Sequence, residues 1–246
     1  MKSNPMIRKG LGQTHSYTGE AMSVAGTRNK TLLLMSITFI IALLAYLVCY
    51  NGGQPNFQLA NTISITSSVI GLILIIGMMF KPQAAKTFAF IYAVTEGLFV
   101  GAITVTFSYY FDGVVPKAII LTVLAVIFTI LLYKEAPTLA SKIRSGVIIL
   151  TFTILLASIL GIAFYALGFG NVLYGTSPIS IGFSMLVVLV AIANLMLDYD
   201  NVIYGSRMNL PKHMEYFFAV GILVTVVWVY VEMLKLLAKL AARSSD

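Results

Sequence analysis

Seven long apolar runs separated by short loops constrain the fold of this chain more than any other feature of its sequence. An α-helix needs about 18 apolar residues or more to cross the hydrocarbon core of a bilayer, and each run reaches that length. The runs extend from Thr31 to Tyr50, Thr62 to Phe80, Phe88 to Phe111, Pro116 to Tyr133, Gly146 to Leu167, Pro178 to Leu197 and Tyr216 to Ala238. A soluble domain carries about 25% charged residues, whereas this chain has 10%. The sequence therefore predicts an all-α, polytopic membrane protein, folded as a bundle of seven transmembrane helices.

These crossings use most of the 246 residues and leave no room for a second folded domain. We expect a polar, basic N-terminal tail at residues 1–30, one transmembrane domain at 31–240 and a short C-terminal tail at 241–246. The first run has no small-residue cleavage site behind a short apolar core, so it is predicted to be an anchor rather than a removable signal peptide. Cys49 is the single cysteine, which excludes an intrachain disulfide and disfavours a cysteine-based metal site.

The distribution of basic residues predicts the orientation, because lysine and arginine are retained on the cytoplasmic side. Twelve of the sixteen lie in the N-terminal tail and in alternate loops, and only Lys117 lies in the opposite loops. This bias predicts a cytoplasmic N-terminus. Lys235, Lys239 and Arg243 do not fit, since seven crossings would put them outside. The net charge of +7 is explained by this orientation in a lipid bilayer, and we expect no nucleic-acid partner. The short loops and the absence of disulfides favour a bacterial inner membrane.

Carboxylates within the runs are the candidates for function, because a charge at lipid depth is costly unless it faces protein or water. Four of the nine acidic residues fall in tails or loops, where a solvated surface explains them: Glu20, Asp112, Glu135 and Asp246. Glu96 lies in the third run, about 15 Å from its start at 1.5 Å per residue. Gly97 and Gly101 form a G-x-x-x-G pair beside it that allows another helix to approach closely. Glu96 is therefore expected at a helix interface, either in an ion or proton path or as a protonated, hydrogen-bonded group.

The other four candidates lie in the last two runs and their ends. Asp198 and Asp200 stand about 200° apart at the end of the sixth run, so only one can face the bundle. Asn194 is one turn before Asp198 on the same face, which favours Asp198 as the inward residue. Glu215 precedes the seventh run, where an acid is favoured by the helix dipole. Glu232 lies deep in the seventh run, where Lys235 at i+3 offers a partner within the helix.

Catalysis is not supported by these residues. Intramembrane aspartyl proteolysis would fit Tyr199–Asp200, but no G-x-G-D motif follows. A retinal-binding pump would need a lysine near the middle of the last helix, and Lys235 lies near its end. His15 and His213 lie in the tail and a loop, and no H-E-x-x-H motif occurs. We expect no enzyme activity and no cofactor apart from a possible calcium ion.

The seven-run layout and three motifs resemble the Bax inhibitor-1/YccA family of seven-helix membrane proteins. The motifs are "TEGLFVGAI" in the third run, "LDYDNVI" after the sixth and "WVYVEMLKLLAKL" in the last. The segment "AMSVAGTRNKT" is similar to the one that opens the first helix in a prokaryotic branch of that family. The resemblance covers roughly residues 20 to 240. It implies a passive, pH-sensitive calcium leak, in which an aspartate on the sixth helix and another on the seventh sense protons.

Carried over by motif, the sixth-helix aspartate falls on Asp198, with Asp200 as the alternative, and the seventh-helix aspartate falls on Glu232. Calcium would then bind at Asp198 and Glu232. The long separation of these two leaves another arrangement open, in which Asp198 meets Glu215 and Glu232 meets Glu96. Two carboxylates in a low-dielectric site repel as anions and share a proton, and their oxygens suit calcium.

Three functional interpretations follow. The leading one is a gated aqueous path for calcium, lined by Glu96, Asp198 and Glu232. The second is a regulator without transport activity that binds a membrane protease or another membrane partner, with residues 1–30 available to a cytoplasmic machine. The third is a structural bundle whose buried carboxylates transport nothing.

Overall fold

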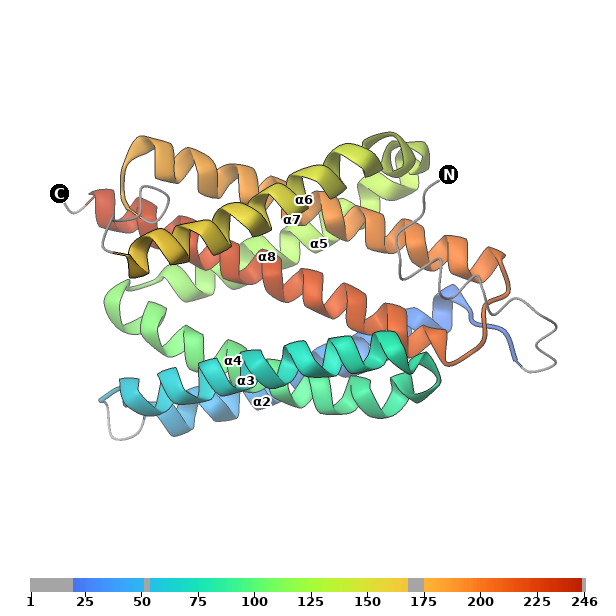
Figure 1. The fold of residues 1–246 in the computed structure, drawn as a ribbon, viewed down its shortest axis with the longest axis horizontal. Coiled ribbons are helices and arrows are strands. Elements are labelled where there is room, and N and C mark those ends of the chain that lie inside the picture. The colour runs from blue at the N-terminus through green and yellow to red at the C-terminus, as the bar shows by residue number, and fades with distance from the viewer. Residues whose placement is uncertain (1–19, 51–53, 168–174, 245–246) are drawn as a thin grey trace. The chain divides into compact units, whose positions relative to one another are not determined.

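The computed structural model describes residues 20–50, 54–167 and 175–244. In these residues seven helices are long and apolar enough to span a membrane, and no strand is present (Figure 1). The helices are α2 (Val24–Cys49), α3 (Phe57–Phe80), α4 (Ala85–Tyr110), α5 (Val114–Glu135), α6 (Pro137–Ala166), α7 (Pro178–Arg207) and α8 (Met214–Ser244), with a 3-10 turn, η2 (Pro82–Ala84), before α4. The predicted all-α membrane protein of seven helices is confirmed. The parts of the predicted tails at 1–19 and 245–246 lie outside the described residues.

Several helices extend beyond the apolar runs, because hydropathy marks the apolar stretches of a helix and not the polar turns at its ends. α2 begins at Val24 rather than Thr31, and Ser23 caps its first turn by accepting a hydrogen bond from Gly26 N at 2.9 Å. α7 continues to Arg207 rather than ending at Leu197. The apolar run suggested that Asp198 and Asp200 lie at the end of the sixth helix. In the structure they lie inside α7.

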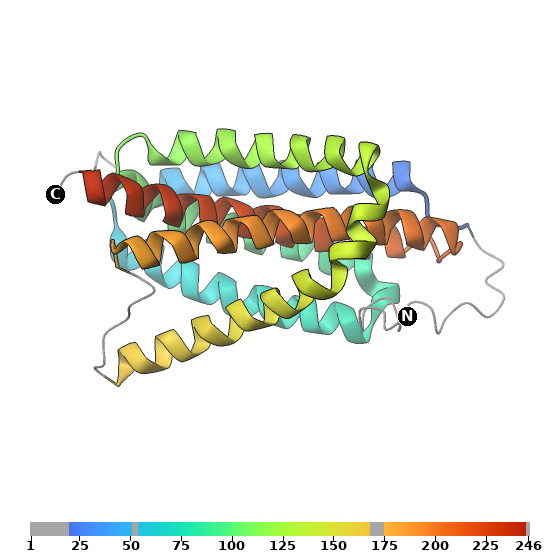
Figure 2. The ribbon, with the colours of Figure 1, turned by 90° about the horizontal axis from the view of Figure 1, so that it is seen from above.

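The chain divides into two compact units, each described here by itself. Unit 1 consists of Met1–Tyr109 and Asp198–Val224, and unit 2 of Tyr110–Leu197 and Thr225–Asp246. α7 and α8 each contribute residues to both units. The chain reverses direction at the short connection between these two helices, which belongs to unit 1 (Figure 2).

Glycines bring α2 and α4 close together in unit 1. A Cβ added at Gly97 would lie 2.7 Å from Ile41 Cβ, and one added at Gly101 would lie 2.7 Å from Ala45 Cβ. Thr38 donates a hydrogen bond across the same interface to Ala93 O at 3.0 Å. The close helix approach predicted from the G-x-x-x-G pair is thus confirmed, and its partner is α2.

Aromatic residues gather at the end of α2 and the facing ends of α3 and α4. The rings of Tyr46 and Tyr50 stack at 5.5 Å, and Phe57 meets Tyr109 edge to face at 5.2 Å. Tyr46 and Ser108 also share a hydroxyl hydrogen bond of 3.2 Å. Aromatic side chains with polar tips favour the boundary between lipid and water, so this end of unit 1 suits a membrane interface.

Unit 2 is packed around α6 and α7. Ala140 and Val147 of α6 form a buried cluster with Met196 and Leu197 of α7. A second cluster joins Ile154, Val187 and Val190, against which Phe183 and Trp228 pack. Between them Asn194 donates to Thr151 Oγ1 at 2.7 Å, so a polar bond links the two helices within the apolar contact.

Replacing Gly101 by alanine tests the close packing of α2 on α4. The new Cβ would meet Ala42 O and Ala45 Cβ, and overpacking of this kind costs about 1–3 kcal/mol of unfolding free energy. Gly182→Ala is the matched control, since nothing lies within 4 Å of the added carbon and alanine favours a helix. Thermal unfolding in detergent should show a lower midpoint for Gly101→Ala only. Equal midpoints would contradict this packing.

Candidate functional site

The connection between α7 and α8 has a defined shape set by the end of α7. Asn209 adopts a left-handed conformation with φ of 50°, which asparagine tolerates better than most residues. Asn209 N donates to Ser206 O at 3.1 Å and Leu210 N to Gly205 O at 3.2 Å. This is the Schellman pattern of a helix end, and Leu210 packs over Gly205 as that motif favours. The chain then turns and starts α8 at Met214.

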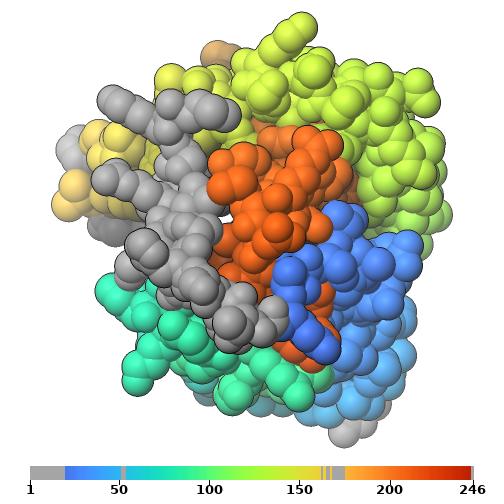
Figure 3. All heavy atoms as spheres, turned by 90° about the vertical axis from the view of Figure 1, so that its right-hand side faces the viewer, coloured from blue at the N-terminus to red at the C-terminus, as the bar shows by residue number. Residues whose placement is uncertain are grey.

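Residues 20–23, named here the strap, pair with this connection in antiparallel fashion. Met22 N donates to Leu210 O at 2.7 Å, and Lys212 N donates to Glu20 O at 3.0 Å. Ala21 and Pro211 face each other between these bonds as an isolated bridge. Such a facing pair makes no backbone hydrogen bond of its own, so proline is tolerated at position 211. In Figure 3 the blue start of the described chain lies against the orange connection.

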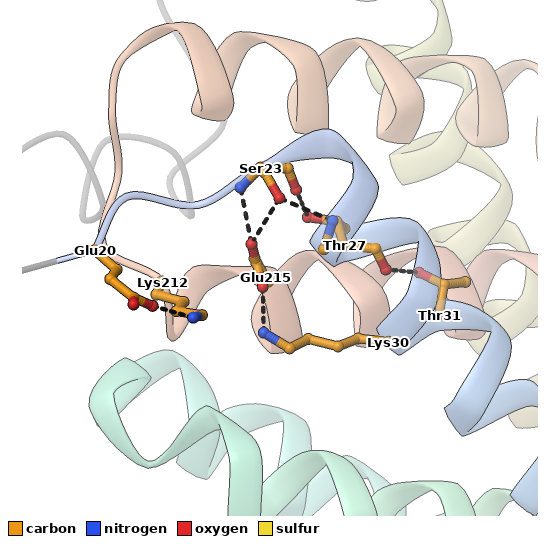
Figure 4. Close-up of polar contacts among 8 residues, drawn as sticks. Glu20, Ser23, Thr27, Lys30, Thr31, Lys212 and Glu215 are labelled. Carbon is orange, nitrogen blue, oxygen red and sulfur yellow. Dashed lines mark hydrogen bonds and ion pairs between the residues drawn. The ribbon is translucent and has the colours of Figure 1, made fainter.

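A buried carboxylate lies where the strap, α2 and α8 meet. Glu215, in the first turn of α8, is 3% exposed. Its Oε1 accepts hydrogen bonds from Ser23 N at 2.8 Å and from Ser23 Oγ at 3.1 Å. Its Oε2 forms an ion pair with Lys30, whose ammonium also lies 4.5 Å from the centre of the Tyr216 ring. Figure 4 shows the contacts of Ser23 and Lys30 converging on the carboxylate of Glu215.

Gly26 leaves the space for that carboxylate. A Cβ added at this position would overlap the carboxyl group of Glu215. The ionised form of Glu215 suits this setting, because two hydrogen-bond donors, a cation and the start of a helix all face it. The prediction of a helix-start acid at position 215 is confirmed. Sequence reasoning missed Lys30, Ser23 and Gly26, although an S-x-x-G capping pattern followed by a lysine was visible in the printed chain.

Glu96 has a different environment in the middle of α4. The hydroxyl of Tyr92, one turn earlier, shares a hydrogen bond with its carboxyl group. Across the interface with α3, a Cβ added at Gly71 would lie 3.5 Å from Tyr92 Cε2 and 3.9 Å from Glu96 Oε2. No ion pair to Glu96 occurs within the described part of the chain. Glu96 thus lies at a helix interface, as the sequence predicted, with a neutral partner.

Asp198 and Asp200 are both partly exposed on α7 and belong to unit 1. Which of them faces the bundle stays a prediction, as does contact between Asp198 and Glu215. Asn194, used to favour Asp198, spends its amide on Thr151 and on Val190 O. Among the described residues no group of three or more His, Cys, Asp or Glu side chains is placed to hold a metal ion. Calcium at Asp198 and Glu232, which belong to different units, stays a prediction, as does contact between Glu232 and Glu96.

The lysines near the C-terminus have partners inside unit 2. Lys235 pairs with Glu232 at 2.8 Å, as the i+3 spacing predicted, and Glu232 is 9% exposed. Lys239 donates to Ser180 Oγ and Ser184 Oγ, each at 2.8 Å, and to Ser180 O at 3.3 Å. Both lysines therefore neutralise or bind groups within the helices.

Three titratable groups lie in the strap and in the connection between α7 and α8, outside the membrane-spanning helices. Lys212 forms an exposed ion pair with Glu20, and its hydrogen bond and charge hold the pKa of Glu20 below the ordinary value. Glu20 in turn raises the pKa of Lys212. Burial lowers the pKa of His213, whose Nε2 is enclosed and has no hydrogen-bond partner among the described residues. The connection therefore contains a histidine that resists protonation.

A family model described as Bax inhibitor 1 like matches residues 4–242, nearly the whole chain. No curated protein and no solved structure matches.

Removing either charge of the ion pair between Lys30 and Glu215 tests whether this pair holds unit 1 together. Removing one partner of a buried pair costs about 3–5 kcal/mol, so Lys30→Met and Glu215→Gln should each lower the unfolding free energy by that order. The double variant should lose less than the sum, because the second change leaves no unpaired charge. Gly26→Ala keeps every charge and should still destabilise, since its Cβ displaces the carboxylate. Denaturant titration followed by circular dichroism measures all four, and strictly additive losses would contradict a direct pair.

His213 predicts a pH dependence of stability with a defined sign. Its pKa in the folded protein is below the unfolded value of about 6.5, so the unfolded chain binds more protons as the pH falls below that value. The contribution of neutral His213 is thus present above about pH 6.5 and is lost during acidification. The thermal midpoint of His213→Gln should fall less than that of the wild type between neutral and mildly acidic pH. Parallel curves for the two proteins would show that His213 does not titrate differently on folding.

Proposed function

Because the chain belongs to the Bax inhibitor 1 like family and has seven helices fit to cross a membrane, we propose that it is a pH-sensitive passive leak for cations, with calcium as the cation. The proposal places it in a bacterial inner membrane with its N-terminus in the cytoplasm. The family match and the seven helices establish the multi-pass membrane protein. The leak and its control by protons are inferred from the carboxyl groups.

The observation that carries the proposal is the setting of Glu96. It lies about 17 Å along α4 at 1.5 Å per residue, with a tyrosine hydroxyl as its hydrogen-bond partner. Glu96 is partly buried, and a carboxyl group at a helix interface without a cation beside it favours its neutral form. Such groups in membrane helices commonly line ion or proton paths. Ionisation of Glu96 would add a charge directly beside Gly71 of α3.

This charge has two consequences for transport. It changes how α3 and α4 pack at a point where Gly71 of α3 leaves space for Tyr92 and Glu96 of α4, and so couples protonation to helix arrangement. The ionised carboxylate of Glu96 is also an oxygen ligand of the kind that calcium prefers. The protonated form lacks both effects, which makes the leak sensitive to pH.

The carboxylates with lysine partners take a different role in this proposal. Glu215 pairs with Lys30 and so ties α8 to α2, whereas Glu232 pairs with Lys235 inside α8. Asp198 and Asp200 are proposed as further members of the path. Their substitution would then change the size of the leak more than its pH dependence.

Calcium entry into liposomes that contain purified protein, measured from about pH 5 to pH 8, tests the proposal. In Glu96→Gln the side chain is permanently neutral. The entry rate of this variant should lose its pH dependence and stay close to the wild-type rate at the acidic end. Glu135→Gln removes an exposed glutamate and should behave as the wild type. Asp198→Asn should alter the rate at every pH.

Two results would contradict the proposal in different ways. Wild-type pH dependence in Glu96→Gln would remove Glu96 as the proton sensor and leave the leak in place. Calcium entry no faster than in empty liposomes at any pH would remove the leak itself. The regulator of a membrane protease or other membrane partner would then be the function to test.

A further inference from the structure

Apart from the hydrogen bonds of Ser23 to Glu215, the strap is attached to the rest of unit 1 by few contacts. Of its four residues only Met22 is buried, at 3% exposure, against Gly205 in α7. Two backbone hydrogen bonds join it to the connection between α7 and α8. The ion pair between Glu20 and Lys212 is exposed, and exposed pairs contribute little. An isolated bridge of this kind is far from a sheet and can open without unfolding the helices.

The strap nevertheless controls a buried charge. Ser23 supplies both hydrogen bonds to Glu215 Oε1, one from its backbone and one from its hydroxyl. If residues 20–23 move away, the carboxylate keeps Lys30 as its only described partner. Water would then reach a carboxylate that is 3% exposed while the strap is docked. A weakly held segment therefore decides how firmly the start of α2 is held to the start of α8.

We propose that residues 20–23 form a detachable strap that holds the leak closed. When the strap is docked on residues 210–212, Glu215 is enclosed and ties α2 to α8. When it is detached, water reaches the ion pair between Lys30 and Glu215, and the two helix ends are held together less firmly. The effect on calcium entry rests on the proposed function, whereas the opening of the strap does not.

Two designed changes move the strap in opposite directions. Met22→Ser removes the buried anchor, and Val24→Ser is its matched control because Val24 is 45% exposed. Ala21→Cys with Pro211→Cys fixes the docked state. A facing pair without backbone bonds has Cα atoms about 4.5 Å apart, which a disulfide spans. This pair is introduced together with Cys49→Ala, which removes the native cysteine.

The reactivity of Lys30 toward a water-soluble amine reagent, measured by mass spectrometry, reports the strap without reference to transport. Exposed Lys117 serves as the internal reference. Lys30 should react several-fold faster in Met22→Ser than in Val24→Ser. It should react more slowly in the oxidised double-cysteine protein than in the same protein after reduction. Calcium entry should rise in Met22→Ser and fall on oxidation.

The outcomes separate the strap from the leak. If Lys30 reactivity follows the strap and no variant passes calcium, the proposed function fails and the strap stands. If calcium entry depends on pH but oxidation changes neither Lys30 reactivity nor entry, the strap proposal is overturned. Because the disulfide fixes the native arrangement, its result decides the question even if Met22→Ser does not fold.

Discussion

The ion pair between Glu215 and Lys30 is the interaction on which the described arrangement of unit 1 depends. A carboxylate that is 3% exposed requires partners for its charge, and it finds them in two residues at the start of α2, Ser23 and Lys30. Lys30 and Ser23 position the first turns of α2, and the turn at Pro211 delivers Glu215 to them. Gly26 leaves the space that the carboxylate occupies. An unpaired charge in this position would cost several kcal/mol, so the start of α2 and the start of α8 are held together.

The carboxyl groups of the membrane helices fall into two classes by their partners. Glu215 and Glu232 each form an ion pair with a lysine, Glu215 between α8 and α2 and Glu232 within α8. Glu96 has a tyrosine hydroxyl and a glycine on the neighbouring helix. A carboxyl group of the second class can be protonated without leaving a lysine unpaired, so proton sensing and structural fastening are assigned to different residues.

The fold was largely predictable because length and hydropathy decide it, and the G-x-x-x-G pair at Gly97 marked a real helix contact. The ends of the helices could not be predicted, because polar turns such as the one capped by Ser23 carry no hydropathic signal. The partner of Glu215 could not be found either, because Lys30 lies 185 residues away in sequence and was counted as a topology signal. The same reading treated Lys239 as a tail charge, whereas its ammonium binds two serines of α7. Local pairs such as Glu232 with Lys235 were predictable because helical spacing fixes them.

The division of roles between Glu96 and Glu215 can be measured directly by infrared difference spectroscopy between alkaline and acidic pH. The carbonyl stretch of a protonated carboxyl group reports which glutamate takes up a proton. We predict an acid band that titrates over the pH range in which calcium entry changes. This band should be absent in Glu96→Gln and retained in Glu215→Gln. A band that disappears in Glu215→Gln and persists in Glu96→Gln would contradict this prediction.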